Sequence, residues 1–330
     1  MKTIRNIFIV LALFLLFYYI FSQSKIYPTN ELLYGITFSK KQASSLGQNW
    51  QASFLTILDE LKVKRVRLSA YWDETEPTKG SYNWQDLDWQ LAEAKKRNVE
   101  VVLAIGARLP RWPECHFPSW AKDKNNQDRE TDLLDYVQAT IERYKGHDEI
   151  KAWQIENEPF LPYFGECPQP DKKLLDKEID LARSLDSRQI VVTDSGELSV
   201  WFLAARRADI FGTTMYRDTY SAKLKRYIHY PITPRFFIFK KNLAKLFASP
   251  KKWIVIELQS EPWGPIPYQN LSKEDRDKTM NPQKFKEILE FARQAGFQEF
   301  YLWGAEWWLW ERDMQKDPEM WNMAKELFNK

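Results

Sequence analysis

Two glutamates close apolar stretches of the sequence, and their type and position suit acid–base or nucleophilic chemistry. Glu158 ends the stretch Ala152-Trp153-Gln154-Ile155-Glu156-Asn157-Glu158, and Glu257 ends Trp253-Ile254-Val255-Ile256-Glu257. A carboxylate at the end of a buried strand is costly unless it serves a purpose. Two carboxylates that face each other over one pocket are the apparatus of glycoside hydrolysis, in which one protonates the leaving oxygen and the other attacks the anomeric carbon.

The two glutamates sit in a chain that repeats one strand–helix unit. Short apolar runs rich in β-branched residues alternate with longer amphipathic stretches. The predicted strands are Leu33–Phe38, Val63–Ser69, Glu100–Gly106, Ile150–Ile155, Ile190–Thr193, Ile210–Met215, Trp253–Glu257 and Glu299–Trp303. The predicted helices lie around Ala52–Leu61, Trp84–Lys96, Asp132–Tyr144, Lys173–Leu185, Val200–Ala205, Phe236–Phe247, Pro282–Ala295 and Pro318–Phe328. Asn281-Pro282 and Asp317-Pro318 are each typical of an N-cap followed by proline at the first helical position.

Eight strands, each followed by a helix, predict an α/β fold, a parallel (β/α)8 TIM barrel in a single domain. An open doubly wound sheet fits less well, because no G-x-G-x-x-G follows the first strand. The stretch Tyr216–Arg235 is expected to be an inserted loop. In a closed barrel the fourth and seventh strands face each other across the mouth, so Glu158 and Glu257 should meet there.

The motif Asn157-Glu158-Pro159 at the fourth strand, with Glu257 at the seventh, resembles the clan A glycoside hydrolases. The similarity is closest to the family 5 cellulase-like enzymes, with some likeness to family 42 β-galactosidases, and it extends from about Leu33 to the end of the chain. It implies that Glu158 is the general acid/base, that Glu257 is the nucleophile, and that Asn157 binds the sugar 2-hydroxyl. It also implies retention of configuration, for which the two carboxyls should lie about 5–5.5 Å apart.

Further residues match the same resemblance, and others depart from it. Arg67 at the end of the second strand, Tyr216 after the sixth and Trp303 at the end of the eighth are implied substrate-site residues. Arg67 has the alternative of pairing with Asp73 or Glu74. Family 5 enzymes usually place histidines after the third strand and around the sixth. Here the third strand ends Gly106-Ala107-Arg108, and the later His116 is expected to be structural. Two rival carboxylates, Glu261 and Glu306, follow the seventh and eighth strands, but only Glu257 directly ends its strand.

Tryptophan is unusually frequent, with 15 Trp against 11 Gly. Eight tryptophans follow the second, third, seventh and eighth strands, where they would surround the same mouth as the two glutamates. Aromatic faces pack well against the C–H face of a sugar ring. These eight are Trp72, Trp112, Trp120, Trp263, Trp303, Trp307, Trp308 and Trp310, and we expect Trp263, Trp303 and Trp307 to contact the substrate.

The N-terminus has the pattern of a targeting segment. Lys2 and Arg5 precede the apolar run Ile7–Phe21, which is shorter than a bilayer core of about 30 Å requires. Residues 1–24 are therefore predicted to be a signal peptide or signal anchor and residues 25–330 the barrel domain, secreted or anchored outside the cytoplasm. The membrane would be contacted only through this segment, if it is not cleaved. In an oxidising compartment Cys115 and Cys167, both in proline-containing loops, form a disulfide or remain two thiols.

Composition narrows the function further. The net charge of +3 includes no long basic block, which argues against nucleic acid as a partner, and three histidines make a histidine-rich metal site a poor expectation. The predicted chemistry requires no metal or organic cofactor. We therefore expect a retaining β-glycosidase acting on an oligo- or polysaccharide. The alternatives are a non-catalytic, membrane-associated carbohydrate-binding protein and a transglycosylase with the same residues. Sugar type and endo or exo action stay open.

Overall fold

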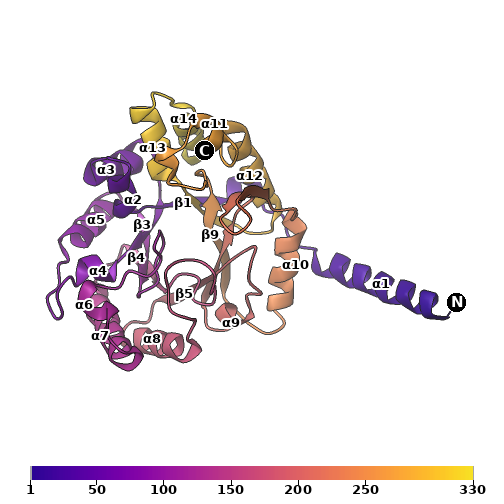
Figure 1. Ribbon diagram of the computed structural model, residues 1–330, viewed down its shortest axis with the longest axis horizontal. Coiled ribbons are helices and arrows are strands. Elements are labelled where there is room, and N and C mark those ends of the chain that lie inside the picture. The colour runs from indigo at the N-terminus through magenta and orange to yellow at the C-terminus, as the bar shows by residue number, and fades with distance from the viewer. Residues whose placement is uncertain (1, 330) are drawn as a thin grey trace.

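Eight parallel strands close into a barrel in the computed structural model, which describes residues 2–329 (Figure 1). The order around the barrel is β1-β2-β3-β4-β5-β6-β9-β10, and β10 pairs with β1 through partners such as Leu33 and Glu299. The predicted (β/α)8 barrel is confirmed, and β9 runs on to Gln259, two residues beyond Glu257. The barrel strands are β1 (Leu33–Thr37), β2 (Arg65–Ser69), β3 (Glu100–Ile105), β4 (Ile150–Ile155), β5 (Gln189–Asp194), β6 (Ile210–Met215), β9 (Lys252–Gln259) and β10 (Glu299–Trp303).

Helices surround the barrel, as Figure 1 shows. The longer ones are α3 (Trp50–Leu61), α5 (Gln85–Lys96), α7 (Asn126–Tyr144), α8 (Lys172–Leu185), α10 (Pro234–Ala244), α12 (Pro282–Gln294), α13 (Ala305–Met314) and α14 (Glu319–Phe328). Helix α12 begins as predicted, because the Asn281 side chain accepts from the Lys284 amide at 2.9 Å. The prediction for α14 is wrong by one residue: Pro318 is its N-cap, and Asp317 accepts from the Glu319 amide at 3.2 Å.

Several short elements lie in the segments between strands and helices. The predicted helix Val200–Ala205 shrinks to α9 (Phe202–Ala205). The expected loop Tyr216–Arg235 contains an antiparallel hairpin of β7 (Asp218–Ser221) and β8 (Arg226–His229), whose four-residue strands are too short and polar to show a clear alternation. The remaining short helices are α2 (Lys40–Ser45), α4 (Trp72–Thr75), α6 (Ser119–Lys122), α11 (Lys273–Asp277) and the 3-10 turns Thr29–Glu31 and Tyr268–Asn270.

Helix α1 (Lys2–Phe21) projects away from the barrel and meets it only near α10 (Figure 1). Its C-terminal end rests on Phe239, whose ring lies 5.1 Å from that of Tyr18, and the Asn242 amide donates to the Phe21 carbonyl at 2.8 Å. Apolar side chains along it are exposed, Leu13 by 61%, so it is not a core helix. No helix within the described residues combines the length and hydrophobicity that a membrane crossing needs.

Candidate active site

Arg67 lies at the mouth of the barrel and forms hydrogen bonds to residues from two other strands. It lies in β2 with no exposed surface, and its guanidinium joins the ends of two other strands. Its Nη1 donates to Glu257 Oε1 at 2.7 Å and its Nη2 to Asn157 Oδ1 at 2.7 Å, while Nε donates to Gln154 at 2.8 Å. Because the guanidinium is a rigid planar fork, these bonds fix the end of β4 relative to that of β9. The alternative in which Arg67 pairs with Asp73 or Glu74 is wrong.

Glu257 is held through both carboxylate oxygens. Arg67 occupies Oε1, and the Tyr216 hydroxyl donates to Oε2 at 3.0 Å. Burial, followed by the charges of Glu257, Glu261 and Glu158, raises the pKa of Tyr216 well above its usual value, so this phenol keeps its proton and acts as a donor. The result is a nearly buried carboxylate, 5% exposed, in one fixed orientation beside a permanent cation.

Glu158 lies in a different environment from Glu257. It has a left-handed backbone, with φ of 44°, and its amide donates to Thr193 Oγ1 at 2.8 Å. Such backbones recur at functional sites, where the surrounding structure enforces them. Burial raises the pKa of Glu158 well above its usual value, and the neighbouring carboxyls of Glu257, Glu114 and Asp194 raise it further, against an opposing effect of Arg108. These effects favour the protonated form of Glu158.

The Asn157 amide has one orientation. Its Oδ1 accepts from Arg67 and from Thr193 Oγ1 at 3.2 Å, and since arginine has only donors, the Nδ2 atom must point the other way. There it donates to Glu114 Oε2 at 3.2 Å. Glu114 lies in the loop after β3 and not at the end of a strand, so the sequence pattern did not predict it as a site residue. Its position directly before Cys115 is the feature of the sequence that could have indicated it.

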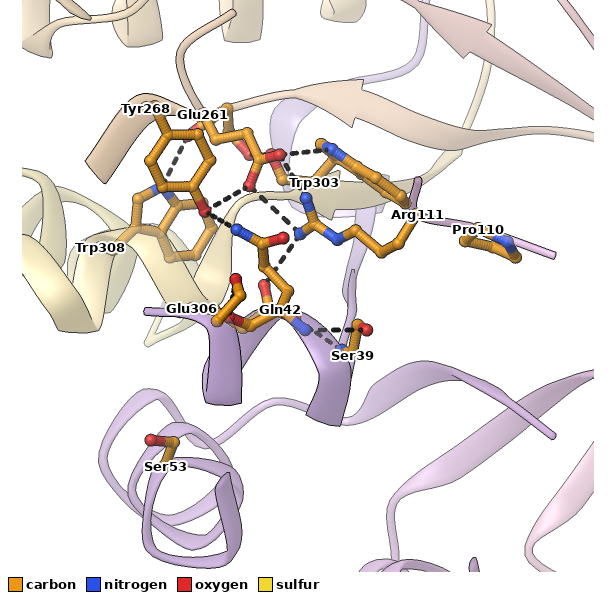
Figure 2. A network of polar contacts seen from close by, with 12 residues as sticks. Ser39, Gln42, Ser53, Pro110, Arg111, Glu261, Tyr268, Trp303, Glu306 and Trp308 are labelled. Atoms are coloured by element: carbon orange, nitrogen blue, oxygen red, sulfur yellow. Dashed lines mark hydrogen bonds and ion pairs between the residues drawn. The ribbon is translucent and has the colours of Figure 1, made fainter. Parts of the chain in front are cut away.

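The two rival carboxylates share a second arginine, as Figure 2 shows. Arg111 donates from Nη2 to Glu261 at 3.1 Å and to Glu306 at 3.2 Å, and its Nη1 also contacts Glu261. Glu261 further accepts from Trp303 Nε1 at 2.8 Å and from the Tyr268 hydroxyl at 3.3 Å. Burial raises the pKa of Glu306 to about 7. Both oxygens of Glu261 are thus occupied, in a cluster separate from the Arg67 contacts.

Trp263 belongs to a row of aromatic rings that leads outward from Tyr216. Its ring lies 5.4 Å from that of Tyr216 on one side and 5.6 Å from Phe164 on the other. Phe164 in turn contacts Trp112 at 6.0 Å, and Trp112 is 62% exposed. The row runs from the phenol that contacts Glu257 to the solvent.

The other predicted tryptophans are more deeply packed. Trp303 is 5% exposed, and the Arg111 guanidinium lies 4.0 Å above its ring. Trp307 donates its indole N–H to Glu311 at 3.1 Å and packs near Tyr268, whose hydroxyl donates to Glu261. Trp72 and Trp308 are completely buried. The expectation that all eight tryptophans line the mouth is therefore wrong for this last pair.

The loops after β3 and β4 are fastened to each other. Cys115 and Cys167 form a disulfide, and Arg108 donates to the carbonyls of Leu161 and Phe164, both at 2.8 Å. His116 next to the disulfide is buried, which lowers its pKa to about 4, and its ring contacts Arg111 O at 3.2 Å, consistent with the expected structural role. Within residues 2–329, no group of three or more His, Cys, Asp and Glu side chains has the arrangement of a metal site.

Comparison with known proteins gives partial matches. The model of glycosyl hydrolase family 10 matches residues 40–168, which is less than half of the chain. Beta-galactosidase BgaA of Clostridium cellulovorans is 23% identical over 222 residues, 60% of this chain and 33% of that protein. Endo-1,4-beta-xylanase A of Fusarium oxysporum f. sp. lycopersici is 29% identical over 90 residues, 26% of this chain and 25% of the xylanase. The chain thus spans a third or less of the length of these relatives.

Among solved structures, the family 10 endo-beta-1,4-xylanase from Gloeophyllum trabeum superposes with a TM-score of 0.56 at 14% identity, over 82% of this chain and 84% of the xylanase. At this identity the likeness is one of fold. The fold and the matched family model make the chain similar to the TIM-barrel glycoside hydrolases.

Proposed function

We propose that the protein is a retaining β-glycosidase that cleaves O-glycosidic bonds of an oligo- or polysaccharide by double displacement. One observation carries the proposal: two carboxyls at the mouth of one barrel have opposite environments. Glu257 has a guanidinium at 2.7 Å and a hydroxyl donor at 3.0 Å, whereas burial and neighbouring carboxylates raise the pKa of Glu158 well above its usual value. Carboxyl pairs with environments that differ in this way divide into a nucleophile and an acid.

The proposed reaction begins with attack by a Glu257 oxygen on the anomeric carbon. The bond between that carbon and the leaving oxygen breaks, and the proton of Glu158 passes to the leaving oxygen. The Glu158 carboxylate then takes a proton from a water molecule, whose oxygen attacks the anomeric carbon and releases Glu257. In this sequence Asn157, held by Arg67, would donate its free amide hydrogen to the sugar 2-hydroxyl. The two carboxyls are predicted to lie about 5–5.5 Å apart, as retention requires.

The substrate class follows from the aromatic row and the relatives. Trp263, half-buried between Tyr216 and Phe164, offers a surface on which a sugar ring next to the cleaved bond can pack. Trp303 stays a predicted substrate contact, whereas the indole N–H of Trp307 is already bonded to Glu311. The matched model is that of family 10, and relatives include a β-galactosidase and xylanases. The resemblance to family 5 remains a prediction, as does the choice of sugar.

A panel of aryl β-glycosides tests the proposed function. At least one should be hydrolysed, with the first-formed sugar keeping its β configuration by NMR, and Glu257→Gln should abolish turnover. A 2-deoxy-2-fluoro glycoside should trap the intermediate, and peptide mass spectrometry should find the sugar on Glu257. A label on Glu261, inverted product or undiminished activity of Glu257→Gln would refute the assignment. Binding without turnover would indicate the carbohydrate-binding protein, and transfer to added acceptors a transglycosylase.

We further propose that the protein works outside the cytoplasm, with residues 1–24 as a signal peptide or anchor and residues 25–330 as the catalytic domain. The Cys115–Cys167 disulfide supports an oxidising compartment. The exposed apolar side chains of α1, which touch the barrel mainly through Phe239, support a targeting role. Sequencing the N-terminus of the exported protein would distinguish cleavage after about residue 24 from an intact anchor.

A further inference from the structure

A third carboxyl, that of Glu114, lies among the residues of the proposed active site. It is 4% exposed, and its Oε2 accepts from Asn157 Nδ2 at 3.2 Å. It lies near enough for the charge of Glu257 to raise its pKa, and it is one of the carboxyls that raise the pKa of Glu158. Neither the sequence motif nor the proposed mechanism gives this residue a task.

The backbone around Glu114 is held from several sides. Its amide donates to Arg111 O and its carbonyl accepts from Leu109 N, both at 2.8 Å, in a left-handed conformation with φ of 70°. The next residue forms the disulfide to Cys167. Across the loop, a Cβ on Gly165 would lie 2.6 Å from Glu114 Cβ, so only glycine leaves room there. These contacts hold the Glu114 side chain in one position against Asn157, as a residue that positions a substrate requires.

The chemistry of the pair suits a hydroxyl group. Asn157 Nδ2 carries two hydrogens, of which one goes to Glu114 and the other has no partner within residues 2–329. Burial, followed by the charge of Glu257, raises the pKa of Glu114 to about 8, so at neutral pH this carboxyl is mostly a neutral acid that can both donate and accept. A sugar hydroxyl is likewise both donor and acceptor, and can bond to the amide and the acid at once.

We propose that Glu114 is a substrate-positioning residue that, with Asn157, binds the 2-hydroxyl of the sugar whose bond is cleaved. The inference rests on the proposed function. It assigns Glu114 from the loop after β3 to the same ring position as Asn157 from the end of β4. Glu114 takes no part in proton transfer to the leaving group.

The test compares the aryl β-glycoside that the wild type hydrolyses best with its 2-deoxy counterpart. Glu114→Ala should lower kcat/KM for the parent substrate by about tenfold to hundredfold, the range for a hydrogen bond to an ionisable group, and change the 2-deoxy value less than about threefold. Glu114→Gln, which keeps a neutral hydrogen-bonding group, should restore most of the activity. Gly165→Ala should reproduce the selective loss by displacing Glu114, and the exposed Glu166→Ala serves as the matched control.

The results on the two substrates distinguish a positioning role of Glu114 from a purely structural one. An equal loss on both substrates would mean that Glu114 only supports the fold, and no loss on either would mean that it does not reach the substrate; each overturns the inference. A wild type that turns over no aryl glycoside would overturn the proposed function and, with it, this inference. Circular dichroism and thermal unfolding of each variant identify any that fails to fold, in which case Glu114→Gln and Gly165→Ala decide.

Discussion

Replacing Glu158 by alanine should separate substrates by the quality of their leaving groups. A carboxyl that protonates the leaving oxygen matters most where that oxygen departs poorly, and little where it departs as a stable anion. Glu158→Ala should therefore slow hydrolysis of an alkyl or unsubstituted phenyl β-glycoside severely, and leave bond cleavage in a dinitrophenyl β-glycoside nearly intact. The environment of Glu158 supports this, since burial and three neighbouring carboxyls keep its proton in place.

The size of the effect follows from that environment. General acid catalysis contributes about 10²–10⁴-fold, or about 2.7–5.5 kcal/mol at 1.36 kcal/mol per tenfold. Because the raised pKa of Glu158 keeps the acid form populated at neutral pH, the loss on a poor leaving group should fall in the upper half of that range. The wild-type rate should also decline as pH rises through this raised pKa, because the proton donor is lost, and the variant should lack that decline.

The assay is pre-steady-state kinetics with the dinitrophenyl substrate. Without a base to activate water, the glycosyl-enzyme should accumulate, giving a burst of phenolate followed by slow turnover. Added azide needs no deprotonation, so it should restore the rate and yield a β-glycosyl azide. Glu166→Ala, which removes an exposed carboxylate from the same loop, should behave as wild type. Equal losses on good and poor leaving groups, without rescue by azide, would refute the role of Glu158.

Three further predictions concern residues around the site. Burial, then the charge of Glu156, raises the pKa of Glu178 well above its usual value, so the folded protein loses stability as rising pH removes this proton. Glu178→Gln should therefore raise the free energy of unfolding in urea by on the order of 1 kcal/mol in alkaline buffer and change it little in acid. Arg111→Met leaves Glu261 buried without its cation and should lower the free energy of unfolding in urea by about 3–5 kcal/mol; a smaller loss would mean that Glu261 simply becomes protonated. Trp263→Ala should raise KM by about two- to tenfold with little change in thermal stability, and the reverse pattern would make it a scaffold residue.

The barrel and the Glu158–Glu257 pair were accessible from the sequence because both depend on local pattern. Strands buried on both faces are nearly continuous apolar runs. Glu257 closes the apolar run of β9, and Glu158 comes three residues after the end of β4. Arg67 was accessible for the same reason, since it lies near the end of a predicted strand. The local pattern does not indicate which residue Arg67 contacts, because Glu257 lies 190 positions further along the chain.

The features that the sequence did not indicate lie in loops. Glu114 reaches Asn157 only because the chain after β3 turns back on itself, through left-handed residues at Arg111 and Glu114, and is tied to Cys167. Arg111 meets Glu306 across 195 positions. Such contacts depend on how two long loops pack against each other over the mouth of the barrel. Neither loop has a periodic sequence pattern from which this packing could be predicted.

The distribution of arginines around the mouth supports the proposal that Glu158 is the acid and Glu257 the nucleophile. Arg67 is bonded to Glu257, and Arg111 is shared between Glu261 and Glu306. Glu158 has no such ion pair among the described residues. The neighbouring carboxyls raise its pKa, and Arg108, in the loop after β3, opposes them. Carboxyls buried together without a cation cannot all ionise, so those without one keep protons. In the proposed mechanism, the ion pair with Arg67 therefore distinguishes Glu257, the nucleophile, from Glu158, the proton donor.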